Sequence, residues 1–139
     1  TPTETPSPPP ETPVLQDLAK ANNLLIQALQ SPTEANLSAL SALWQDEAET
    51  QVQTFVQTIR QKYQPPLRVW YSIFGLPQIT PGANADRVTV QSREFWVYED
   101  VRGKREVLNE YRYTMQNREG RWVIVSYQFE PLPLTGPAQ

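Results

Sequence analysis

Residues 85–132 carry the strongest structural signal of the chain, ADRVTVQSREFWVYEDVRGKREVLNEYRYTMQNREGRWVIVSYQFEPL. Runs rich in β-branched and aromatic residues predict three antiparallel strands, at residues 86–98, 105–117 and 121–132. Two short turns separate the strands, and Gly120 suits the positive φ that a tight hairpin needs. We therefore expect a meander that the rest of the chain covers.

The first of these strands has an interrupted pattern. Its apolar residues alternate on two different faces, Val88 and Val90 on the first and Phe95 and Val97 on the second. The polar residues Ser92 and Glu94 interrupt the first face. Either both faces are partly covered, or a β-bulge near residues 92–94 switches the faces and bends the strand.

Three helices are expected before the sheet. Apolar residues at three- and four-residue spacing predict helices over residues 14–30 and 41–63. Between them, Ser31-Pro32-Thr33-Glu34 has the residues of a helix start and predicts a short helix over residues 32–42. Pro65-Pro66 then ends the third helix.

The remaining segments predict one domain with loose ends. Residues 67–74 are rich in β-branched and aromatic residues and predict a further strand, and the Gly- and Pro-containing residues 75–84 predict a loop. Residues 1–13 hold six prolines and no large apolar residue, which predicts a disordered linker. We expect a single domain over residues 14–134 and a flexible tail at residues 135–139. Because residue 1 is not Met, we expect a piece of a longer protein.

Composition argues against several classes of function. The net charge is −3 and both signs are interspersed, so nucleic-acid binding is not expected. No apolar run reaches the length of a membrane span, so a membrane would be contacted only through a region outside this chain. The chain has no Cys and no His, which excludes thiol chemistry, a Ser-His-Asp triad and ordinary zinc sites. We expect no metal and no cofactor.

Three helices followed by a curved antiparallel sheet resemble the NTF2-like (SnoaL/cystatin-like cone) superfamily. The resemblance implies an α+β fold with four or more strands wrapped around a cone-shaped hollow. A narrower resemblance is to the C-terminal domain of cyanobacterial and plastid cell-division proteins that carry a J-like domain. The matching motifs are Leu43-Trp44 with Ala48, Trp70-Tyr71-Ser72-Ile73, Ala85-Asp86-Arg87-Val88-Thr89-Val90, Tyr111-Arg112-Tyr113-Thr114-Met115 and Gly120-Arg121-Trp122-Val123-Ile124. In plastids that domain lies in the intermembrane space, which implies an extracytoplasmic or membrane-tethered location.

Enzymes of the superfamily place a carboxylate or a histidine in the cone as general base. Here the resemblance leaves Glu94 and Glu110 as the only candidates. An apolar hollow would raise the pKa of such a carboxylate. The alternative is that Glu94 pairs with Arg93 or Arg112 on a solvated face.

Aromatic residues supply the other candidate binding groups. They could line a pocket, form the core or anchor a protein interface, where Trp and Tyr dominate the binding energy. These aromatic candidates are Trp70, Trp96, Tyr98, Tyr111 and Tyr113, and Trp44 and Trp122 are expected in the core. The basic turn at residues 102–105 is either solvated or contacts an acidic partner.

The sequence favours a non-catalytic domain that binds another protein, a peptide segment or a ligand, held on a Pro-rich tether to a membrane-anchored protein. A homodimer is a further option. The alternative is a small-molecule-binding protein or a SnoaL-like isomerase or lyase that uses a pocket carboxylate. A hollow filled by side chains would favour the first function, and an open hollow lined by polar groups the second.

Overall fold

The computed structural model describes residues 11–132, so the expected tail and most of the expected linker lie outside the described residues. The helices are α1 (Glu11–Gln30), α2 (Glu34–Ala39), a 3-10 turn η1 (Leu40–Ala42) and α3 (Glu47–Lys62). α1 begins three residues before its predicted start. No helix within residues 11–132 is long and apolar enough to cross a membrane.

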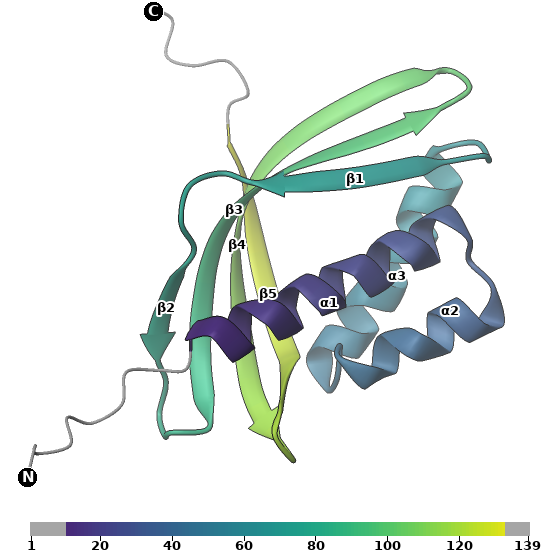
Figure 1. Ribbon diagram of the computed structural model, residues 1–139. Helices are drawn as coiled ribbons and strands as arrows, with labels where there is room; N and C mark the ends of the chain where they lie inside the picture. Colours follow the sequence, from purple (N-terminus) through teal and green to yellow (C-terminus); the bar gives the residue numbers. More distant parts are fainter. Residues whose placement is uncertain (1–10, 133–139) are drawn as a thin grey trace, which may run out of the picture.

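The strands form one antiparallel sheet in the order β1-β3-β4-β5, with β2 pairing beside β1 on the same edge of β3. Their bounds are β1 (Arg68–Ile73), β2 (Gln78–Pro81), β3 (Arg87–Asp100), β4 (Gly103–Arg118) and β5 (Arg121–Leu132). The predicted class is confirmed: α+β, with three helices packed on a curved antiparallel sheet (Figure 1). The prediction of a loop over residues 75–84 is wrong for residues 78–81, which form β2.

All three helices lie on one face of the sheet (Figure 1), which we call the inner face; the other is the outer face. On β3 the even-numbered residues from Val88 to Tyr98 are all buried and share the inner face, without a register shift against β4. The bulge suggested near residues 92–94 is therefore wrong. The register shift lies on β5, where Val125 has no partner between Thr114 and Met115 of β4. The other interpretation of the β3 pattern, that both faces of the strand are partly covered, is the one observed, because Val97 on the outer face is buried too.

The segment between η1 and α3 explains why the predicted third helix starts too early. Leu43 accepts a 2.8 Å hydrogen bond from the Ile124 N–H, and Ile124 accepts one of 2.8 Å from the Gln45 N–H. Farther along β5, the Gln51 side chain bonds both the N–H and the C=O of Tyr127. These contacts satisfy backbone groups that an edge strand would otherwise leave unpaired. They also fix the helices against the sheet.

Candidate functional site

A fully buried carboxyl group lies at the centre of the inner face. Glu94, on β3, has 0% of its surface exposed. Trp96 Nε1 donates a 2.8 Å hydrogen bond to Glu94 Oε1, and the Tyr113 hydroxyl donates one of 2.8 Å to Oε2. The expected pairing of Glu94 with Arg93 or Arg112 is wrong, because both arginines lie on the outer face.

Burial raises the pKa of the Glu94 carboxyl above its usual range, because the ionised form loses its hydration. The hydrogen bonds from Trp96 and Tyr113 favour the ionised form and oppose this rise. Burial is the larger effect, so the surroundings favour the neutral carboxyl. This is the direction that the sequence predicts for a carboxylate in the hollow.

Two further polar groups near Glu94 are buried. Asn22, on α1, and Ser92, two residues before Glu94 on the same face of β3, are each 1% exposed. By hydrogen-bond geometry Asn22 Oδ1 and Ser92 Oγ have no partner among residues 11–132, although both side chains lie close enough to the Glu94 carboxyl to lower its pKa. Buried polar atoms without a partner are rare in folded proteins and often bind an ordered water or a ligand group.

Aromatic side chains fill the hollow around this polar centre. Tyr71 stacks on Trp96 with ring centroids 4.7 Å apart, and Tyr111 stacks on Tyr113 at 5.5 Å. Near the mouth, the exposed Phe129 stacks on Tyr111 at 5.5 Å. The free space between the side chains is about 10 Å³. That volume suits at most one water molecule, whereas drug-sized ligands need roughly 300–1,000 Å³.

Glu110, the second predicted carboxylate, lies on the outer face of β4. It accepts a 3.2 Å hydrogen bond from Arg93 Nε and another from the Gln91 amide. The Gln91 bond is the main cause that lowers the pKa of the Glu110 carboxyl. The structure therefore does not bring Glu94 and Glu110 together.

The predicted aromatic candidates divide between the two faces of the sheet. Trp96, Tyr98, Tyr111 and Tyr113 are buried on the inner face, whereas Trp70 is 40% exposed on the outer face. Arg68 lies over the Trp70 ring, 5.6 Å from its centroid. The core positions expected for Trp44 and Trp122 are confirmed.

Trp70 belongs to an apolar surface on the outer face that we call the outer patch. Register places Trp70 opposite Val97, and Phe95 opposite Leu108, which in turn lies opposite Leu132. The outer patch comprises Trp70, Phe95, Val97, Leu108 and Leu132. Phe95, Leu108 and Leu132 are not among the binding residues predicted from the sequence, although strand alternation places them on the face opposite Glu94.

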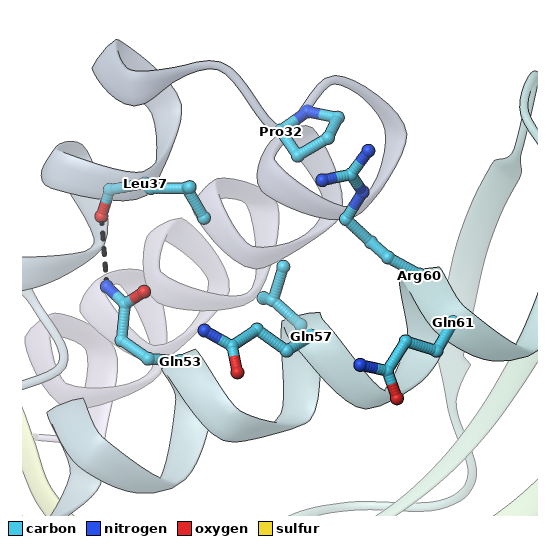
Figure 2. Close-up of a pocket in the computed structure, with 7 residues that line it drawn as sticks. Pro32, Leu37, Gln53, Gln57, Arg60 and Gln61 are labelled. Atoms are coloured by element: carbon cyan, nitrogen blue, oxygen red, sulfur yellow. Dashed lines mark hydrogen bonds between the residues drawn. The ribbon is translucent and has the colours of Figure 1, made fainter.

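A second depression lies between α2 and α3 (Figure 2). It has a volume of about 300 Å³, with the buried Val56 on its floor and polar side chains of α3 around it. Gln53 Nε2 donates a 3.3 Å hydrogen bond to the Leu37 carbonyl across it. The ionisable side chain among its lining residues is the exposed Arg60.

No protein-family model matches the chain, and no curated protein matches it. Solved structures do match. The intermembrane-space region of the chloroplast protein ARC6 has 13% identity and a TM-score of 0.65, covering 91% of this chain and 100% of that chain. The periplasmic domain of DotI has 16% identity and a TM-score of 0.66, covering 94% and 99%. The fold is the NTF2-like cone.

The same cone is found in an enzyme-like neighbour. A putative scytalone dehydratase from Novosphingobium aromaticivorans has 10% identity and a TM-score of 0.59, covering 86% of this chain and 84% of that chain. At such low identities the likeness shows the fold alone, because one fold hosts many unrelated functions.

Proposed function

We propose that this cone is a non-catalytic interaction domain whose outer patch binds a segment of another protein. The observation that carries the proposal is the filled hollow, which leaves about 10 Å³ between its side chains. A substrate has no room beside Glu94 unless several stacked aromatic rings move. Binding is therefore assigned to the surface.

The outer patch has the composition of a protein-binding surface. Trp70 is exposed, and Phe95, Leu108 and Leu132 are half-buried around the buried Val97. Within residues 11–132 no helix covers this face (Figure 1). Contiguous apolar groups that are only partly covered, with an exposed aromatic anchor among them, are typical of protein interfaces. The charged pair Arg93–Glu110 lies at the border, as polar groups do at an interface rim.

In this proposal the buried residues of the predicted site support the binding surface and do not contact the partner. Trp96, Tyr98, Tyr111 and Tyr113 would then be core residues that pack the sheet against the helices, whereas the exposed Trp70 and the outer-face Glu110 would contact the partner. A homodimer through the same patch would be one form of this function.

A second function is favoured by one observation. By hydrogen-bond geometry Asn22 Oδ1 and Ser92 Oγ have no partner among residues 11–132, and burial favours the neutral carboxyl of the neighbouring Glu94. Together these polar groups could form the floor of a small-ligand pocket. Movement of Phe129 away from Tyr111 would open the mouth of the hollow. Small-molecule binding, with or without isomerase or lyase chemistry, is therefore the alternative.

The setting of the domain is part of the proposal. The Pro-rich composition of residues 1–10, which precede α1, suits a semi-rigid spacer, and we propose that this segment joins the domain to a membrane-anchored protein. Likeness to a periplasmic domain and to an intermembrane-space region supports an extracytoplasmic location. The resemblance of the sequence motifs to those of cyanobacterial and plastid division proteins supports a role in cell division.

Photo-crosslinking in the native cell tests the proposed function. Benzoylphenylalanine replaces Trp70 in one variant and Lys20, whose side chain is 71% exposed on α1, in a matched control. We expect one discrete protein adduct from position 70 that is absent from position 20, and weaker capture when Phe95 is changed to Ala. No adduct from position 70, together with a small molecule that co-purifies with the protein and is lost in Trp96→Phe, would reject it in favour of the alternative.

A further inference from the structure

A basic groove lies at the end of the cone, between the C-terminal end of α3 and the β3–β4 hairpin. Its volume is about 270 Å³. Four cations line it, Lys62 from α3 and Arg102, Lys104 and Arg105 from the hairpin, against one carboxylate, that of Asp100. This local excess of positive charge stands out because the whole chain carries a net charge of −3.

Asp100 offsets the charge of Arg102, with which it forms a 3.3 Å ion pair, and leaves the other three cations of the groove without a carboxylate partner among residues 11–132. The Asp100 oxygens accept 2.9 Å hydrogen bonds from the Gln64 and Arg102 backbone N–H groups, and the side chain is only 3% exposed. The Gln64 bond is the main cause that lowers the pKa of the Asp100 carboxyl. Arg102 Nη2 also donates a 2.6 Å hydrogen bond to the Lys62 carbonyl. The hairpin is thus clamped to α3, and the groove is held in shape before a ligand arrives.

The other three cations are available for binding. Lys62, Lys104 and Arg105 are exposed and have no ion-pair partner among the residues that the structure describes. Glu99 lies opposite Lys104 in the β3–β4 register, but it pairs with Arg68 at 3.7 Å on the outer face.

We propose that this groove binds an acidic segment of a partner protein. The proposal rests on the proposed function in taking the ligand to be a protein segment, and it adds the chemistry of that segment. The cations come from two elements and surround a depression whose floor includes Tyr63, which suits an extended chain with carboxylates along it. A bilayer is less suited, because Val101, 66% exposed at the hairpin turn, is the one exposed large apolar side chain of this hairpin.

Fluorescence anisotropy on the whole 139-residue chain tests the groove alone. The probe is a labelled decapeptide of alternating Glu and Ser, compared with the same peptide carrying Gln for Glu. We expect the Glu peptide to bind at least ~10-fold more tightly at about 20 mM salt, and to lose most of this advantage at about 300 mM. Equal binding of the two peptides, or no binding of the Glu peptide, would overturn the proposal.

Charge reversal locates the site. Lys62→Glu with Arg105→Glu should weaken binding of the Glu peptide at least ~10-fold, whereas Arg112→Glu with Arg121→Glu changes the net charge equally and should weaken it less than ~3-fold. Equal losses in both pairs would contradict a defined groove. If the first pair unfolds, Lys62→Gln with Arg105→Gln replaces it. Binding to phosphatidylglycerol vesicles without peptide binding would also overturn the proposal. If the Glu peptide does not bind but crosslinking at position 70 still captures a protein, the groove proposal is wrong and the proposed function stands.

Discussion

The Tyr113 hydroxyl donates a 2.8 Å hydrogen bond to Glu94 Oε2 between two neighbouring strands, with both side chains closed off from solvent. The bond joins the two central strands of the sheet on the inner face of the cone. It also makes Glu94 part of the core instead of a surface residue. The stability of the fold should therefore depend on the protonation of this one carboxyl group.

The free energy of unfolding of the Glu94→Gln variant should increase, relative to that of the native protein, as the pH rises. Burial raises the folded-state pKa of Glu94, so its favourable contribution is full below the unfolded-state pKa and is lost as the pH rises through the folded-state pKa. Glutamine cannot ionise and keeps the neutral form at every pH. Urea unfolding of both proteins between about pH 4 and pH 8 measures the difference.

Glu110→Gln is the matched control, because it should show the opposite sign. Hydrogen bonding lowers the folded-state pKa of Glu110, so its contribution is present above the unfolded-state pKa and is lost as the pH falls through the folded-state pKa. The Gln variant should therefore be less stable than the native protein near neutral pH and equally stable in acid. The same pH trend in both variants would contradict the buried position of Glu94.

Tyr113→Phe should destabilise the protein by about 1–3 kcal/mol, because it leaves a buried carboxyl oxygen without its Tyr113 hydrogen bond. Tyr127→Phe is the control, since Tyr127 also lines the hollow but its hydroxyl makes no hydrogen bond within residues 11–132. Its cost should stay below about 0.5 kcal/mol. Chemical unfolding gives both values. Equal losses of stability in the two variants would show that the Glu94–Tyr113 hydrogen bond makes no contribution of its own to stability.

Gln51→Ala should open the free edge of β5. The Gln51 amide bonds both backbone groups of Tyr127, and its loss should cost about 1 kcal/mol and speed hydrogen exchange at the Tyr127 amide. Gln57→Ala, on the exposed side of the same helix, should leave exchange at Tyr127 unchanged. Unchanged exchange in Gln51→Ala would mean that the edge is protected in another way.

The three long strands were predictable from local pattern because each is rich in β-branched and aromatic residues and is bounded by turn residues. The sequence bounds of β3, β4 and β5 differ from the observed ones by at most two residues. β2 escaped prediction because its four residues lie among Gly and Pro and form a strand only by pairing with β3. The break before α3 escaped because its backbone bonds are made to Ile124, far along the chain.

The polar residues Ser92 and Glu94 left two interpretations of β3 open, a bulge or a strand covered on both faces, and the second is the one observed. Strict alternation places both residues on the same face as Val88 and Val90, but two polar residues on a core face favour a bulge instead. What keeps Glu94 inside is a set of partners that local sequence does not reveal, chiefly Trp96 and Tyr113. Asn22 could have been recognised, since it lies four residues after Leu18 on the buried stripe of α1.

The indole N–H signals of the four tryptophans offer the most direct test that the partner binds outside a closed hollow. Trp70 lies in the outer patch, Trp44 and Trp96 line the hollow, and Trp122 is in the core. A ¹⁵N correlation spectrum is recorded while the partner captured at position 70 is titrated in. The account predicts that the Trp70 signal shifts and that the Trp44 and Trp96 signals stay in place. Shifts of Trp44 and Trp96 with an unchanged Trp70 would contradict it and assign binding to the hollow.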